Sequence, residues 1–279
     1  MKPSIYTIVL SRYSIEKALK LIQETGGKYI ELMGQGWAGS HVPPSLTIDE
    51  AKKLKNLIDD LGLECIALST YVGKPGFSKL SEEQAEKELK DYRHYLKIAE
   101  VLECNAIRVV PGGPSPHEAS REEWKRSVKY VQKCADMNPE VNVLLEVHYG
   151  SLVEDADSCL KYLQLVNRDN VGLIYDPANL FIAKLHKPEV DYSKEFIKKT
   201  KDKIFHVHAK NVVKAKNEKG FELTYLDKGS LDYREILRLL KDAGYRNYVS
   251  IEYHVLDKSL QKEILIKDFN ALKKILERI

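Results

Sequence analysis

Ionisable side chains stand at the ends of short apolar runs in the second half of this 279-residue chain. Four of them occupy the same position relative to their runs: Glu146, Asp176, His208 and Glu252. Three carboxylates and one imidazole suit a divalent ion such as Mn²⁺, and Mg²⁺, Co²⁺ or Zn²⁺ also match this donor set. Four protein ligands leave coordination positions for a substrate. The pattern therefore predicts a site for one divalent metal ion, with Mn²⁺ as the first candidate.

Other ionisable residues share a strand face with these four. Side chains two positions apart in a strand point to the same side, which groups Glu146 with His148, His206 with His208 and Lys210, and Glu252 with His254. We expect His148 and Lys210 to orient substrate hydroxyls, with a salt-bridged lysine as the alternative. His206 and His254 are further candidates for substrate binding, and for His206 a hydrogen bond to a ligand is the preferred role.

Two more charged residues interrupt earlier apolar runs. Glu31 lies within Tyr29–Gly34, and Arg108 lies within Ala106–Pro111. Each is a candidate for substrate contact. The alternative is an internal ion pair, including one between the two residues.

The elements that carry these residues alternate between apolar, strand-like runs and segments of helical period. Thr47 and Glu50 predict a capping box at one helix start, and Gly62 is expected to end that helix. Strands are expected at Ser4–Leu10, Tyr29–Gly34, Leu63–Tyr71, Ala106–Pro111, Asn142–Tyr149, Val171–Pro177, Ile204–Val212 and Tyr248–His254. Helices are expected at Ile15–Ile22, Thr47–Leu61, Ser81–Leu102, Arg121–Met137, Val153–Val166, Val190–Thr200, Asp232–Ala243 and Lys258–Ile279.

Eight strands that alternate with eight helices predict an α/β fold, a (β/α)8 TIM barrel that forms one domain over residues 1–279. A doubly wound sheet is the alternative, but no Gly-x-Gly-x-x-Gly motif follows the first strand. Active sites of the barrel fold lie at the carboxyl ends of the strands. That is where the ionisable residues are expected.

Composition limits the classes of partner. The chain has 44 Lys and Arg against 41 Asp and Glu, a balance without the dense basic face of a nucleic-acid binder, so no nucleic-acid partner is expected. No apolar run is long enough to span a membrane, and no signal-peptide core follows Met1. The four cysteines form no CxxC pair, so we expect reduced, mostly buried thiols and a cytoplasmic protein.

Several stretches carry a resemblance to a known family. The most specific are Leu145–His148, Tyr175–Asn179, His206–Asn211, Gly229–Tyr233, Ala243–Tyr245 and Ser250–Glu252. They resemble the xylose isomerase-like TIM-barrel superfamily, which includes sugar isomerases and epimerases, inosose dehydratase and DNA-repair enzymes of the endonuclease IV type. The resemblance implies that Glu146, Asp176, His208 and Glu252 are metal ligands, and the choice of His208 over His206 rests on it alone. Homo-oligomers are common in this group, but no apolar stripe marks an interface.

The sequence also departs from that family. Asn179 stands where metal-dependent ketohexose epimerases and endonuclease IV carry a histidine. An arginine expected after the two histidines is absent, with Lys210 and Lys214 nearby instead. The additional ligands of a three-zinc site are missing, which argues against an abasic-site endonuclease. The resemblance therefore leaves the identity of the substrate open.

The residues and the resemblance together predict a metal-dependent isomerase or epimerase of a sugar or related polyol. A metal ion chelated by a hydroxyl and a carbonyl would acidify the intervening C–H and stabilise an enediolate. Glu146 and Glu252, one on each side of that carbon, would move the proton. Loss of a β-hydroxyl from the same enediolate would make the protein a dehydratase of a keto-inositol or sugar acid. A barrel that binds a sugar without catalysis is a further alternative.

Overall fold

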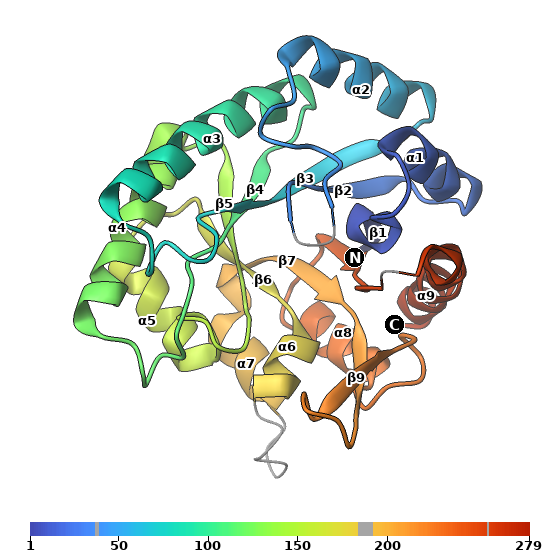
Figure 1. Cartoon of the computed structure of the whole chain (residues 1–279). Helices are drawn as coiled ribbons and strands as arrows, with labels where there is room; N and C mark the ends of the chain where they lie inside the picture. Colours follow the sequence, from blue (N-terminus) through green and yellow to red (C-terminus); the bar gives the residue numbers. More distant parts are fainter. Residues whose placement is uncertain (37–38, 184–191, 256) are drawn as a thin grey trace.

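The computed structural model describes residues 1–36, 39–183, 192–255 and 257–279. Eight parallel strands close into a barrel in the order β1-β10-β7-β6-β5-β4-β3-β2, which confirms the predicted (β/α)8 fold (Figure 1). The barrel strands are β1 (Lys2–Tyr6), β2 (Tyr29–Met33), β3 (Glu64–Val72), β4 (Ala106–Val109), β5 (Asn142–Glu146), β6 (Val171–Tyr175), β7 (Ile204–Ala209) and β10 (Tyr248–Ile251).

Helices surround the barrel on its outside (Figure 1). Thr47 and Glu50 form the predicted capping box at the start of α2, and Gly62 follows that helix with a φ of +65°. This is the left-handed conformation that glycine adopts at low cost. The helices are α1 (Ile15–Glu24), α2 (Ile48–Asp60), α3 (Glu82–Val101), α4 (Arg121–Met137), α5 (Ala156–Val166), α6 (Pro177–Ala183), α7 (Tyr192–Thr200), α8 (Tyr233–Asp242) and α9 (Lys258–Arg278).

The structure shortens several predicted strands. The strands predicted at Asn142–Tyr149 and Tyr248–His254 end three residues early, at Glu146 and Ile251, and two others have a visible cause. The first ends at Tyr6, because Thr7–Leu10 forms a 3₁₀ turn in which the Thr7 hydroxyl accepts a hydrogen bond from the backbone N–H of Met33. The strand predicted at Ile204–Val212 ends at Ala209. Both backbone groups of Lys210 bond to the Tyr233 hydroxyl of α8, at 3.0 and 2.7 Å, in place of a neighbouring strand.

Two local features were not expected from the sequence. After Lys210 the chain forms an antiparallel hairpin of β8 (Asn211–Lys214) and β9 (Phe221–Thr224), which lies outside the barrel sheet. The short helix α6 follows β6 directly. The helix predicted at Val190–Thr200 corresponds to α7 from Tyr192 onward, and its first two residues lie outside the described residues.

Two sets of side chains alternate along the barrel strands. Outward-facing residues such as Leu173 pack with the helices in one large buried apolar cluster. Alternate positions on several strands carry buried polar side chains instead: Ser4, Glu31, Ser69, Arg108, His206, His208 and Ser250. Since side chains alternate between the two faces of a strand, this second set lies on the barrel's inner side. The interior of the barrel therefore carries polar side chains on several strands whose sequences are mostly apolar.

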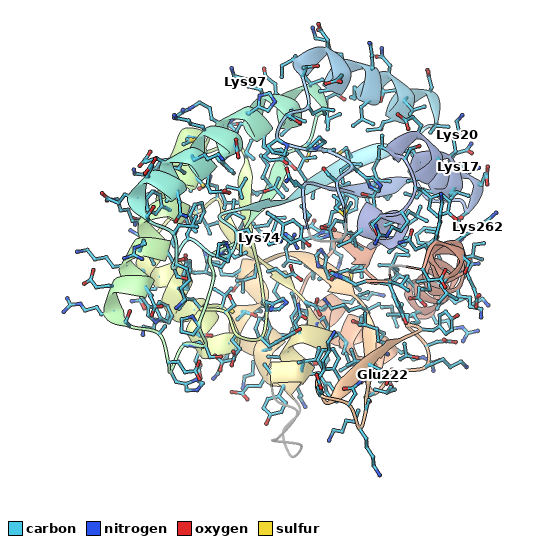
Figure 2. All side chains as sticks on the ribbon, in the orientation of Figure 1. Lys17, Lys20, Lys74, Lys97, Glu222 and Lys262 are labelled. Carbon is cyan, nitrogen blue, oxygen red and sulfur yellow. The ribbon has the colours of Figure 1, made fainter. Side chains whose placement is uncertain are left out.

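The outer surface carries the lysines. Lys17, Lys20, Lys97 and Lys262 are exposed and point away from the barrel, as Figure 2 shows. All four cysteines are buried and free, as expected. Among the described residues, no helix combines the length and apolar character needed to cross a membrane.

The apolar layer between strands and helices generates a prediction about stability. Leu173 is 0% exposed within the buried cluster, so Leu173→Ala should lower the free energy of unfolding by about 2–5 kcal/mol. Leu165 on α5 is 46% exposed, and Leu165→Ala should change that free energy by no more than about 0.5 kcal/mol. Urea denaturation of both variants measures the difference. Equal losses would show that Leu173 does not contribute to the core as described.

Candidate functional site

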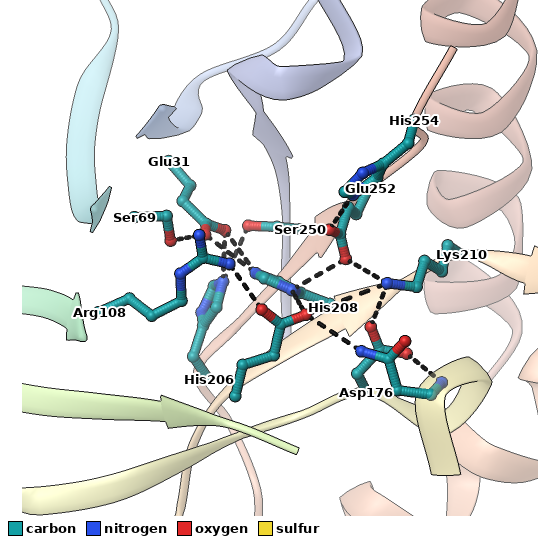
Figure 3. A network of polar contacts seen from close by, with 12 residues as sticks. Glu31, Ser69, Arg108, Asp176, His206, His208, Lys210, Ser250, Glu252 and His254 are labelled. Atoms are coloured by element: carbon teal, nitrogen blue, oxygen red, sulfur yellow. Dashed lines mark hydrogen bonds and ion pairs between the residues drawn. The ribbon is translucent and has the colours of Figure 1, made fainter. Parts of the chain in front are cut away.

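The four residues predicted as metal ligands come together at the carboxyl ends of their strands. Glu146 ends β5, Asp176 follows β6, His208 lies on β7, and Glu252 follows β10. One ligand atom from each lies within 4.8 Å of the others. The His208 Nδ1 atom is 3.0 Å from Glu252 Oε2 and 3.6 Å from Glu146 Oε1. Figure 3 shows this cluster from close by.

Lys210 places a positive charge among these carboxylates. Its Nζ atom lies 2.7 Å from Asp176 Oδ2, 3.0 Å from Glu252 Oε2 and 4.0 Å from Glu146 Oε1. The salt-bridged alternative stated for Lys210 therefore describes this structure. Because these carboxylates attract the ammonium, the pKa of Lys210 is raised despite burial, and the residue stays charged.

Glu146 is held by two neighbours on adjacent elements. Arg108 Nη1 of β4 donates to Glu146 Oε2 at 2.6 Å, and the Asn179 side chain of α6 donates to Glu146 Oε1 at 3.2 Å. The backbone N–H of Asn179 also donates to Asp176 Oδ1 at 2.9 Å. Asp176 thus holds the first turn of α6 with one oxygen while its other oxygen faces the cluster.

The three carboxylates of the cluster differ in their pKa values because their surroundings differ. Burial and the nearby Glu252 charge raise the pKa of Glu146, but Arg108 and His208 outweigh them and hold it well below its usual value. Glu252 is likewise held low, because Lys210, His208 and His254 outweigh its burial. For Asp176, burial and the two glutamates prevail over Lys210 and raise the pKa to about 6. Glu146 and Glu252 therefore stay ionised to lower pH than Asp176 does.

Glu31 lies behind His208, away from the other carboxylates. Its oxygens contact His208 Nε2 at 2.9 and 3.1 Å and His206 Nε2 at 2.9 Å. Ser69 also donates to Glu31, and His206 contacts Ser250. Burial raises the pKa of Glu31, but the two histidines outweigh it and hold the pKa well below the usual range.

A cavity of about 400 Å³ opens beside the cluster, a volume within the range of small-molecule sites. The loops after β4 and β5 form one wall, where a Cβ atom on Gly113 would lie 2.1 Å from the Gly150 carbonyl oxygen. Tyr71, Lys74 and Tyr149 contribute to the lining. Six residues predicted from the sequence also line it: Arg108, Glu146, His148, Lys210, Glu252 and His254.

Two predicted substrate contacts do not line this cavity. Glu31 is fully buried and His206 is 3% exposed, and both bond to groups inside the barrel. The alternative of an internal ion pair describes both Glu31 and Arg108, but they do not pair with each other. Glu31 pairs with the two histidines and Arg108 pairs with Glu146. Strand alternation places both residues inside the barrel but does not tell which neighbours they meet.

The donor set fits a divalent cation. Asp176 Oδ2 and His208 Nδ1 are buried and face the centre of the cluster, where Asp176 Oδ2 meets Lys210 and His208 Nδ1 meets Glu252. With the imidazole proton on Nε2, Nδ1 would offer a lone pair to a cation. Three carboxylates and one imidazole match the ligands of Mn²⁺, Co²⁺ or Zn²⁺, and Mg²⁺ is compatible with the carboxylates. In the part of the chain that the structure describes, the other group able to share an ion is Glu31, His206 and His208.

Sequence reasoning missed several groups that shape the site. Ser69 and Ser250 bond to Glu31 and His206, and Tyr6 stacks on His208 with ring centroids 5.4 Å apart. The signal for Ser250 was present, because in the strand predicted at Tyr248–His254 it lies two positions before Glu252 and four before His254, on the same face. Asn179 had been noted only as a departure from the family.

Fold and sequence together identify the class of protein. The chain belongs to the family described as Xylose isomerase-like TIM barrel, whose family model matches residues 19–275. Among curated relatives, 2-oxo-tetronate isomerase of Haemophilus influenzae is 25% identical over 244 residues, which cover 82% of this chain and 84% of that protein. Inosose dehydratase of Serratia proteamaculans is 25% identical over 247 residues, which cover 80% of each chain.

Solved structures share the fold. The crystal structure of the IOLI protein with a binding zinc atom superposes with a TM-score of 0.78 at 19% identity, and the match covers 100% of this chain and 99% of that one. At this identity the likeness shows a common barrel architecture.

The Arg108–Glu146 pair generates a prediction about pH and stability. Arg108→Met leaves the Glu146 carboxylate without its main partner. The free energy of unfolding at pH 7 should therefore fall by about 3–5 kcal/mol. Because Arg108 lowers the pKa of Glu146 in the folded state, this contribution is present above the unfolded value near 4.5 and is lost as pH falls. The difference in unfolding free energy between Arg108→Met and the wild type should therefore be smaller at pH 4 than at pH 7.

Arg168→Met is the matched control. Arg168 pairs with Asp136 on the exposed surface, so its loss should cost no more than about 1 kcal/mol at either pH. Urea denaturation of the metal-free proteins at the two pH values gives the comparison. A deficit for Arg108→Met that is independent of pH would contradict the electrostatic role.

Proposed function

We propose that this protein is a divalent-metal-dependent isomerase or epimerase that acts on a sugar or sugar-like polyol. The observation that carries the proposal is the convergence of Glu146, Asp176, His208 and Glu252 beside a cavity of about 400 Å³, which Glu146 and Glu252 help to line. The family and the curated isomerase relative support the same reaction class. The four residues would hold one metal ion, for which Mn²⁺ remains the first candidate.

Glu146 and Glu252 are the proposed acid and base. Both are ionised at neutral pH, and they approach the cluster from β5 and β10, so a substrate carbon between them would meet one carboxylate on each side. A bound cation would supply Lewis-acid stabilisation for charge that develops on two substrate oxygens. One glutamate would remove a C–H proton, and either glutamate would return a proton to the same or the adjacent carbon.

The cavity lining suggests how the substrate is oriented. Arg108 is 4% exposed, lines the cavity, and has a buried Nη2 atom without a hydrogen-bond partner. A buried donor of this kind is costly unless a ligand satisfies it, so we assign Arg108 to a substrate oxygen. His148 and His254 also line the cavity and would contact substrate hydroxyls, together with Lys210.

A dehydratase is the second candidate. Lys210 is charged, lines the cavity, and lies 3.0 Å from Glu252, so an acid stands next to a base. In a dehydration, the glutamate would take a C–H proton while the acid protonates the departing hydroxyl, which leaves as water. Sequence similarity to inosose dehydratase over 80% of the chain supports this alternative.

Metal binding is the first test. Mn²⁺, Mg²⁺, Co²⁺ or Zn²⁺ at one hundred times its Kd should stabilise the folded protein by about 2.7 kcal/mol, because the ion binds the folded state. Asp176→Asn should lose most of this stabilisation by the metal ion. Asp157 is exposed and pairs with Lys199, so Asp157→Asn should retain the stabilisation. Thermal unfolding with and without each ion gives the answer. A wild-type protein that none of the four ions stabilises would remove the basis for the proposal.

Proton exchange is the second test. Incubation with aldoses, ketoses, 2-keto sugar acids and keto-inositols in D2O should label a substrate carbon, as seen by NMR. Glu146→Gln and Glu252→Gln should slow this labelling by about 10²–10⁴-fold. Glu263→Gln, on the exposed face of α9, should behave as wild type.

The same spectra separate the two candidates. An isomerase gives labelled product of unchanged composition, whereas a dehydratase gives product that has lost water. Metal content of each variant is measured alongside, because both glutamates are also proposed ligands. Normal labelling in both metal-loaded glutamine variants would rule out their role as bases.

A further inference from the structure

We infer that Glu31 is a positioning residue that fixes the His208 imidazole so that its Nδ1 atom faces the three carboxylates of the proposed metal site. Nothing in the family resemblance assigned this role, and the sequence had suggested substrate contact instead. The inference rests on the proposed metal site, and it concerns how one of the four ligands is held in place.

The two ring nitrogens of His208 face opposite groups. Nε2 lies 2.9 and 3.1 Å from the Glu31 oxygens, and Nδ1 lies 3.0 Å from Glu252 and 3.6 Å from Glu146 (Figure 3). A histidine that binds a metal through one nitrogen commonly donates its other N–H to a carboxylate, which fixes the tautomer and increases the basicity of the ligating nitrogen. Glu31 is placed to accept that N–H.

The orientation of the ring is fixed in two ways. Tyr6 stacks on His208 with an interplanar angle of 16° and a centroid distance of 5.4 Å, which sets the plane of the imidazole. Stacking alone would still allow a half-turn of the ring about its Cβ–Cγ bond, which keeps the plane and exchanges the nitrogens with ring carbons. The bond from Nε2 to Glu31 favours the orientation in which Nδ1 lies beside Glu252.

Glu31 is itself held by a chain of buried hydrogen bonds. Ser69 donates to it from β3, and His206 Nε2 contacts it at 2.9 Å. The same His206 atom lies 2.9 Å from the Ser250 hydroxyl, which lies 2.8 Å from the Ser4 hydroxyl. These side chains are 0–3% exposed. A buried carboxylate with this many partners keeps its position and charge.

The alternative roles of Glu31 fit the structure less well. It does not line the cavity, so it does not meet the substrate. Glu31, His206 and His208 could in principle share a second ion. However, Glu31 already accepts a hydrogen bond from Ser69 and contacts both histidines at hydrogen-bond distances, and none of the three residues lines the cavity. The geometry therefore favours a hydrogen-bonded support for His208.

The test measures the affinity for Zn²⁺ by competition with a chromophoric chelator. Glu31→Gln should weaken binding by about 10–100-fold, while circular dichroism shows a folded protein. Glu31→Asp keeps the charge and should restore part of the affinity. Ser4→Ala removes the far end of the hydrogen-bond chain and should leave the affinity unchanged. A role limited to folding would alter the melting temperature of Glu31→Gln without altering the Zn²⁺ affinity of the folded protein.

A second measurement does not depend on zinc. In ¹⁵N-histidine-labelled protein, the His208 Nε2–H proton should be protected from solvent exchange, with its signal assigned by its loss in His208→Gln. The signal should disappear in Glu31→Gln and persist in Ser4→Ala. If the wild type shows this signal but binds no Zn²⁺, the proposed metal site fails while the positioning stands. Unchanged Zn²⁺ affinity and an unchanged His208 signal in Glu31→Gln would overturn the inference.

Discussion

Repulsion between buried carboxylates is the constraint on which the rest of this site depends. Glu146, Asp176 and Glu252 offer oxygens within 4.8 Å of one another in a region nearly closed to water. Like charges at such separations are strongly unfavourable unless cations or hydrogen-bond donors compensate them. Arg108 supplies that compensation from β4, and His208 and Lys210 supply it from β7 and the residue that follows it. The closed barrel is what brings these groups to a common point.

The compensation is distributed unequally, and this gives the carboxylates different properties. Glu146 pairs with Arg108 and His208, and Glu252 with Lys210, His208 and His254, so their pKa values are held low. Asp176 shares Lys210 with Glu252 and uses one oxygen to hold the first turn of α6, and its pKa rises to about 6. The same chemical group, a carboxylate, therefore has different pKa values in one cluster because its surroundings differ.

Strand periodicity predicted the fold and much of the cluster. The apolar runs that end in Glu146, Asp176 and Glu252 were sufficient to place these residues at one end of a parallel barrel, because all its strands point the same way. The structure also places His208 beside them, although the choice over His206 came from family resemblance. Periodicity could not provide this choice, since both histidines lie on the same face of β7.

The errors have local physical causes. A pair between Glu31 and Arg108 was one of the alternatives, and the structure does not show it. Lateral neighbours in a closed barrel depend on strand order and stagger, which a sequence does not display. The end of β7 was missed because the Tyr233 hydroxyl, more than twenty positions later in the chain, binds the backbone of Lys210. The hairpin after it consists of two four-residue strands, too short to give a distinct pattern.

The contact between the first and last barrel strands has a consequence for how the protein is made. Ser4 of β1 bonds to Ser250 of β10, and Glu31 of β2 reaches His206 and His208, which lie about 175 residues further along the chain. A ribosome has therefore released almost the whole polypeptide before these partners can meet. A nascent chain that stops short of β10 would lack Ser250 and Glu252, and its barrel could not close between β7 and β1.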